Sequence, residues 1–438
     1  MKRKSRVSDF RYDTGAAKVP WCAVGESFEV EDVMEIVRFL LPPAGEQRQK
    51  YEEALRKVHL SMKQLGKLAG RAGKLTLGNR VQEAEEAAKK FLKTPYACLL
   101  TNATAGFEIG YKYAGLKAGD EVIAPAITFI STILYPLEVG ARVVLADVDP
   151  VTLNMDPADV ARKITPKTKV IIPVHLGGYP VDMAPIMKLA KQRDIVVIED
   201  AAHALGAVYR GKMVGTIGHF GAFSLHEVKN INSLGEGGLL VTNLPFGKKL
   251  AQARFVGLDP SRKIPTWLYD VLALKGKGGY FAPGNHSATE IQALGFLLQL
   301  KRIKAIIARR RKNAEYLTRR FSQVSGIIPQ KLDEKNSQST YHLYLFQLDP
   351  KFFKGNIQEF KKRLEAKGVV QIPHFAPLYK FSIMRQLGYD TAAMEKSCPV
   401  AEEAFRNRFT HLPLYPLTED QVKYMAEAVI ECVESMRR

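Results

Sequence analysis

One stretch constrains the fold of this chain more than any other: an apolar strand that ends in two acids and continues into small residues. Residues Ile195 to Ile198 are apolar and β-branched, Glu199 and Asp200 follow, and the next residues are mostly alanine. A buried strand of a parallel sheet has this composition, because helices cover both of its faces. Ligands bind at the carboxyl ends of such strands. Asp200 therefore stands where a ligand site is expected.

Strand and helix patterns alternate along most of the chain. Short apolar segments predict strands over residues 97–100, 142–146 and 341–348, and a helical pattern covers residues 357–368. This alternation is typical of βαβ units, which build a mainly parallel sheet covered by helices. We therefore expect an α/β protein.

Length and composition fit a protein with two domains. The 438 residues suffice for two cores, and contents of 46% hydrophobic and 25% charged residues are ordinary for a globular protein. No apolar run approaches the roughly 20 residues that span a bilayer, and the basic N-terminus lacks the apolar stretch of a signal peptide. We expect a cytoplasmic protein without membrane insertion. The four cysteines are scattered, which argues against a disulfide framework or a metal site.

The formal net charge of +19 is the unusual feature of the composition. An excess of this size favours nucleic acid, a membrane surface or an anionic small molecule such as a nucleotide-linked sugar. No basic-aromatic RNA motif, zinc finger or bZIP region accompanies it, so nucleic-acid binding is not expected. Much of the excess lies between Lys301 and Arg320, where isoleucines at helical spacing predict an amphipathic helix with a solvated basic face.

Lys229 is a candidate for a second functional group of this ligand site. Lys229 follows Asp200 by 29 residues, is preceded by Ser224, and is followed by a glycine cluster that ends at Gly238. Pyridoxal phosphate (PLP) chemistry needs a lysine that forms an imine with the cofactor and a carboxylate that keeps the pyridine nitrogen protonated. Asp200 and Lys229 are our candidates for these roles. The spacing alone also fits an aspartate that caps a helix and a lysine in solvent.

Three motifs connect these residues to a known family. The segments EDAAHALGA, FSLHEVKN and GEGG, in this order and spacing, resemble the core motifs of the DegT/StrS family of PLP-dependent sugar aminotransferases. The residues of these motifs are most similar to those of the branch that aminates UDP-4-keto-pentoses. The similarity runs from about Gly78 to the C-terminus. The resemblance implies a fold-type-I PLP-dependent transferase, with a mixed, mostly parallel sheet in a large domain and a smaller C-terminal α/β domain. It also implies a homodimer.

The family resemblance places the cofactor phosphate at a strand-to-helix turn. In this chain the turn contains Ala103 and Thr104, and small residues there expose backbone N–H groups at a helix start that favours an anion. Ser224 corresponds to the second phosphate-binding hydroxyl of the family. Ala103 departs from the commoner glycine of the family.

Three further residues are assigned to the cofactor by resemblance alone. Phe129 matches the aromatic residue that stacks on the pyridine ring, and His203 matches the residue near the phenolic oxygen. Asn285 lies in a segment that reaches the phosphate of the neighbouring subunit in relatives. Ser287 stands where arginine or asparagine is usual, which leaves this contact in doubt.

The expected activity is transfer of an amino group from glutamate to a keto-sugar, which we expect to be nucleotide-linked. Two alternatives stay open from the residues. A sister branch with histidine in place of Lys229 is a sugar dehydratase, and the lysine argues against that activity. A PLP-binding regulator or scaffold without catalysis is the other alternative.

The N-terminal part of the chain lies outside the resemblance. Residues 44–75 predict an inserted amphipathic helix, either a packing helix, for example at a subunit contact, or a substrate lid. The expected division is an N-terminal extension over residues 1–75, a PLP-binding domain over residues 76–275, and a connecting helix with the small domain over residues 276–438.

Overall fold

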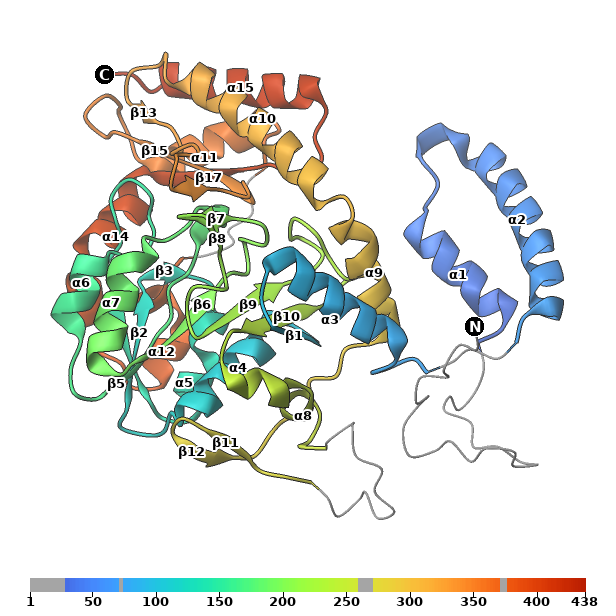
Figure 1. The fold of residues 1–438 in the computed structure, drawn as a ribbon. Helices are drawn as coiled ribbons and strands as arrows, with labels where there is room; N and C mark the ends of the chain where they lie inside the picture. Colours follow the sequence, from blue (N-terminus) through green and yellow to red (C-terminus); the bar gives the residue numbers. More distant parts are fainter. Residues whose placement is uncertain (1–27, 71–73, 259–270, 371–375) are drawn as a thin grey trace.

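The computed structural model describes residues 28–70, 74–258, 271–370 and 376–438, and its large domain is built on a seven-stranded sheet (Figure 1). The strands are β1 (Tyr96–Leu100), β2 (Glu121–Pro125), β4 (Arg142–Ala146), β5 (Thr168–Ile171), β6 (Val196–Asp200), β9 (Phe220–Ser224) and β10 (Gly238–Thr242). They lie in the order β1-β10-β9-β6-β5-β2-β4. The pairs from β4 to β9 are parallel, and β10 is antiparallel to both of its neighbours. The mixed, mostly parallel sheet is confirmed.

Helices cover both faces of this sheet because successive strand side chains point to opposite faces. Val122 and Ile198 pack on the face that is covered by α4 (Ala103–Ala114). Ile123 and Val197 pack on the other face, beneath further helices. These helices are α3 (Asn79–Leu92), α7 (Met183–Arg193) and α9 (Glu290–Leu300). Shorter helices in this domain are α5 (Leu134–Glu138), α6 (Pro157–Lys163) and α8 (Leu250–Arg254).

A second, smaller α/β unit lies toward the C-terminus. Its antiparallel sheet consists of β13 (Ile327–Ile328), β15 (Leu343–Leu348) and β17 (Phe409–Pro413). The helices α10 (Ile303–Phe321), α11 (Ile357–Ala366) and α15 (Glu419–Glu434) contribute to its core. Between α11 and β17, the short helices α12 (Ser382–Gln386), α13 (Thr391–Lys396) and α14 (Pro399–Glu403) pack back against the large domain. The predicted boundary after residue 275 stays a prediction.

Short strand pairs connect distant parts of the chain. β7 (Val208–Tyr209) pairs with β8 (Lys212–Met213) and with β14 (Ser337–Gln338). β11 (Leu274–Gly276) and β12 (Gly279–Phe281) form a hairpin. β3 (Ile127–Thr128) pairs with β16 (Ala376–Pro377), which ties the segment after β2 to the C-terminal part of the chain.

The N-terminal extension forms a helical hairpin. Helices α1 (Val30–Leu40) and α2 (Arg48–Leu68) lie side by side and apart from the main body in Figure 1. Glu31 of α1 is 3.3 Å from the Lys63 ammonium of α2, and Leu55 is buried. The predicted amphipathic helix is therefore present. Across the described ranges, none of the helices is both long and apolar enough to cross a membrane.

Gly238 allows three segments of the large domain to come together. It pairs with Leu100 of β1 on one side and with Ser224 of β9 on the other. A Cβ atom built on Gly238 would lie 2.1 Å from the Asn102 carbonyl carbon, at the start of α4. Only glycine, which has no Cβ atom, permits this approach. The approach brings the ends of β1 and β9 to the first turn of α4.

We expect Gly238→Ala to lower the free energy of unfolding by about 2 kcal/mol, because the added methyl group meets backbone rather than a movable side chain. Gly70→Ala is the control, since a Cβ atom there has no neighbour within 4 Å among the residues that the structure describes. Chemical denaturation followed by circular dichroism measures both variants. Equal stability of the Gly238 variant and the wild type would contradict this account.

Candidate active site

Asp200 occupies the last position of β6, and its carboxylate is buried. Thr132 Oγ1 donates a hydrogen bond to Asp200 Oδ2 at 2.8 Å, and the Ala202 N–H donates to Oδ1 at 3.1 Å. Thr132 is in turn held by the Thr128 hydroxyl at 2.9 Å. Burial raises the pKa of Asp200, while these two hydrogen bonds and the charge of Lys229 act in the opposite direction. A cation next to this carboxylate would be stabilised.

The preceding acid, Glu199, has a structural role on the opposite face of β6. It is fully buried and accepts hydrogen bonds from the N–H groups of Gly215 at 2.8 Å and Ile217 at 2.7 Å. His175 Nε2 is 3.1 Å from Glu199 Oε2, and His175 Nδ1 accepts from the Val181 N–H. The alternation of strand side chains therefore separates a structural acid from a candidate catalytic one.

Lys229 lies in a closed turn after β9. Its N–H donates to the His226 carbonyl at 2.9 Å, and the Glu227 N–H donates to the Gly235 carbonyl at 2.7 Å. The side chain is half-buried, and burial lowers the pKa of Lys229 to about 8, although the charges of Asp200 and Glu236 raise it. At pH 7 roughly a tenth of such an amine is neutral, compared with less than ~0.1% at an ordinary lysine pKa. Lys229 can therefore act as a nucleophile and a base.

The predicted phosphate-binding residues come together at the start of α4. Ala103 and Thr104 form the first turn of this helix, and the Asn102 side chain caps it by accepting from the Ala105 N–H at 2.9 Å. The close approach of the β-strands at Gly238 brings Ser224, at the end of β9, toward the same turn. The N–H groups and the dipole of a helix start favour a phosphate there.

Phe129 and His203 are placed by segments that adjoin Asp200. Phe129 is 54% exposed, unusual for a phenylalanine, and precedes the short 3-10 helix Ile130–Ile133 that carries Thr132. His203 follows β6, accepts from the Gly177 N–H at 3.3 Å, and stacks on His342 with ring centroids 4.4 Å apart. Both positions are compatible with the roles predicted for them, which stay predictions.

Asn285 lies in a segment that contacts the residue before the start of α4 and the strand β1. Its side chain is exposed and accepts a hydrogen bond from Ser287 Oγ at 2.9 Å. The neighbouring His286 carbonyl accepts from the Thr101 N–H at 3.2 Å, immediately before α4. The predicted contact with the phosphate of a second subunit stays a prediction.

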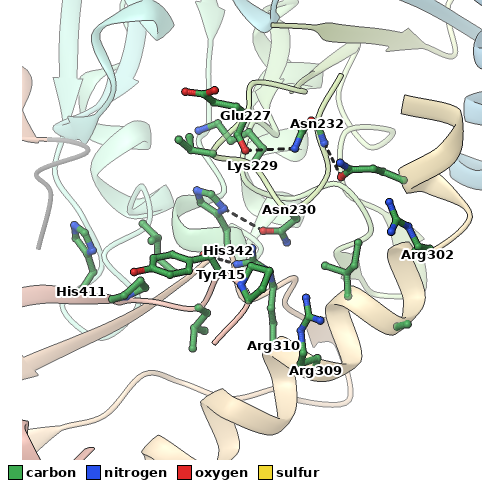
Figure 2. A pocket seen from close by; sticks show the side chains of 18 of the residues that line it. Glu227, Lys229, Asn230, Asn232, Arg302, Arg309, Arg310, His342, His411 and Tyr415 are labelled. Atoms are coloured by element: carbon green, nitrogen blue, oxygen red, sulfur yellow. Dashed lines mark hydrogen bonds between the residues drawn. The ribbon is translucent and has the colours of Figure 1, made fainter. Parts of the chain in front are cut away.

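A pocket of about 800 Å³ opens beside the Lys229 turn (Figure 2). Figure 2 shows Lys229 and His342 on one side of it and Arg302 and Arg309 on the opposite side. His342 Nδ1 is 3.1 Å from Asn230 Oδ1, which connects the lysine turn to β15. Of the predicted site residues only Lys229 lines this pocket. The predicted cofactor residues and the pocket therefore meet at Lys229.

The sequence pattern between Lys301 and Arg320 predicts a solvated helix face. It does not reveal that arginines of this segment line the pocket. Ala305, Ile306 and Arg309 lie on one face of α10, and Arg302 directly precedes its first residue. All four line the pocket. Their spacing is visible in the sequence. It does not reveal which face of the helix meets the lysine turn.

The residues present fit PLP. The buried Asp200 carboxylate suits a protonated ring nitrogen, and the Lys229 amine has the lowered pKa that condensation with an aldehyde requires. The start of α4 offers backbone N–H groups to a phosphate, next to the hydroxyl of Ser224. Phe129 is more than half exposed, so its side chain is accessible to a ligand.

Comparison with known proteins agrees with this geometry. The model of the DegT/DnrJ/EryC1/StrS aminotransferase family matches residues 61–430. The spore coat polysaccharide biosynthesis protein SpsC of Bacillus subtilis is 32% identical over 83% of the chain and 92% of SpsC. A pleiotropic regulatory protein of Geobacillus stearothermophilus is 33% identical, over 82% of the chain and 91% of that protein.

A solved structure extends the comparison to the cofactor. The Streptococcus pneumoniae protein Spr1654, assigned as a sugar aminotransferase, has a PLP-form structure that aligns with a TM-score of 0.72 at 29% identity, over 83% of the chain and 94% of that structure. Its PMP-form aligns with a TM-score of 0.73 at 28% identity.

We expect the cofactor-free protein to capture PLP at a rate that rises with pH around a midpoint near 8, because the neutral Lys229 amine is the reacting form. The visible absorbance of bound PLP measures this rate. Asp200→Asn should move the midpoint below that of the wild type, since the charge of Asp200 raises the pKa of Lys229. A midpoint near 10.5, typical of an exposed lysine, would contradict the assignment.

Proposed function

Because the chain belongs to the DegT/DnrJ/EryC1/StrS aminotransferase family, we propose that it transfers an amino group from glutamate to a nucleotide-linked keto-sugar. Membership makes it a PLP-dependent sugar aminotransferase with the fold-type-I architecture. The observation that carries the proposal is the convergence of a buried acid, a lysine of lowered pKa and a helix start in one site.

When bound, PLP supplies an aldehyde that condenses with amines and a ring that accepts electron density from the substrate carbon. Asp200 would hold a proton at the ring nitrogen, and Thr132 keeps its carboxylate in place. The first turn of α4 and Ser224 would hold the phosphate. Phe129 would cover one face of the ring.

Lys229 performs the proton transfers in this proposal. A base at this position must take a proton from the donor α-carbon and return it to a different carbon, so its pKa should lie near the working pH. The lowered pKa of about 8 meets this requirement. One lysine serves donor and acceptor in turn, which predicts ping-pong kinetics.

The finer parts of the proposal rest on the family resemblance and on charge. Glutamate is the donor implied by the resemblance. The formal charge of +19 favours an anionic acceptor, and a nucleotide-linked sugar is anionic. We further propose that the protein works as a homodimer in the cytoplasm, with Asn285 contacting the phosphate of the second subunit.

The test is a half-reaction that needs no knowledge of the sugar. Glutamate added to the PLP-loaded protein should replace the visible absorbance of bound PLP with the ultraviolet absorbance of the amine form. Lys229→Ala should lower the rate of this change by at least about 10³-fold, because the base is lost. Circular dichroism should show an unchanged fold.

A matched control is Lys335→Ala, an exposed lysine outside the site. It should react like the wild type. A wild-type protein that binds PLP but does not respond to glutamate would contradict the proposal. That outcome would favour a non-catalytic regulator, a role suggested by the name of the Geobacillus relative.

A further inference from the structure

Some of the basic residues in and directly before α10 form ion pairs, and others do not. Arg311 pairs with Asp333 at 2.9 Å, and Lys312 pairs with Glu419 at 2.6 Å. Arg302 and Arg309 form no ion pair with any acid in the described part of the chain, and both line the pocket beside Lys229. The pocket therefore carries positive charge that no acid in the described part of the chain neutralises through an ion pair.

A buried arginine adds to this unbalanced charge. Arg310 also lines the pocket, and its guanidinium donates to the carbonyls of Tyr341 at 3.3 Å and His342 at 3.0 Å. Burial and the charge of Arg309 lower the pKa of Arg310 to about 10. Adjacent guanidinium groups repel each other, so an anion in the pocket would relieve the repulsion.

The remaining charge of the pocket lining does not compensate these arginines. Glu227 is the single acid among the described lining residues. Arg302 also precedes the first residue of α10, a helix of 19 residues whose N-terminus favours negative charge. The uncompensated charge of the arginines and the N-terminus of α10 therefore both favour an anionic ligand at this end of the pocket.

We propose that Arg302 and Arg309 bind the diphosphate of the nucleotide-linked sugar, while its sugar carbonyl faces Lys229 on the opposite side of the pocket. This inference rests on the function proposed above and names the residues that select the substrate. Arg302 and Arg309 are separated by about two helix turns along the pocket, and each planar guanidinium can contact a phosphate group through two hydrogen bonds. A pocket of about 800 Å³ has the size of a small-molecule site.

The test uses inorganic pyrophosphate as the probe and the PLP-loaded protein, in which the cofactor already fills its own phosphate site. Isothermal titration calorimetry should detect binding by the wild type that weakens with added salt. The double variant Arg302→Gln with Arg309→Gln should bind at least about tenfold more weakly, because charge-assisted hydrogen bonds are lost.

Lys312→Gln is the matched control, since it removes one positive charge from the solvent side of the same helix. It should bind pyrophosphate within about twofold of the wild type. Wild-type protein that does not bind pyrophosphate, or a double variant that binds it as the wild type does, would overturn the inference.

The glutamate half-reaction separates this inference from the proposed function. The double variant should react with glutamate at the wild-type rate, because the diphosphate site does not contact the donor. A parallel loss of this rate would show that the arginines hold the donor carboxylate, which overturns the assignment. If the wild type itself fails to react with glutamate while arginine-dependent pyrophosphate binding persists, the proposed function fails and the anion site stands.

Discussion

The structure depends on the electrostatic relation between the buried Asp200 carboxylate and the Lys229 amine. Removing a carboxylate from water is costly unless hydrogen bonds and a positive charge compensate it. Thr132 and Ala202 supply the hydrogen bonds, and Lys229 supplies part of the charge. Lys229 is itself partly desolvated, which lowers its pKa toward neutrality. In the proposed mechanism, the buried Asp200 carboxylate would stabilise a proton on the ring nitrogen of the cofactor. Burial also prepares the Lys229 amine to exchange a proton near neutral pH.

The sheet provides the geometry that makes this relation possible. Asp200 ends a parallel strand, whereas Lys229 follows the next strand and lies before an antiparallel one. Gly238 lets these strand ends approach the first turn of α4, so a helix start and two functional side chains meet at one edge of the sheet. Mutations at such a glycine would disturb the site through the backbone, without touching a reacting atom.

The sequence predicted the strand that carries Asp200 because that signal is local. The apolar strand before Asp200 is a short-range pattern, and the structure has the mostly parallel sheet expected from it. The pairing of Asp200 with Lys229 and the role of Ala103 came from the family resemblance and stay predictions. The hydrogen bond from Thr132 and the arginines of α10 depend on how distant segments pack. The spacing of the arginines is visible in the sequence, yet it does not show which face of the helix meets the Lys229 turn.

The most direct test of the central claim is to trap the cofactor on its lysine. The PLP-loaded protein is reduced with borohydride, digested, and mapped by mass spectrometry. We expect a reduced pyridoxyl phosphate label on the peptide that contains Lys229, and no label in Lys229→Ala. A label on another lysine, or a labelled alanine variant, would contradict the assignment of the catalytic centre to Asp200 and Lys229.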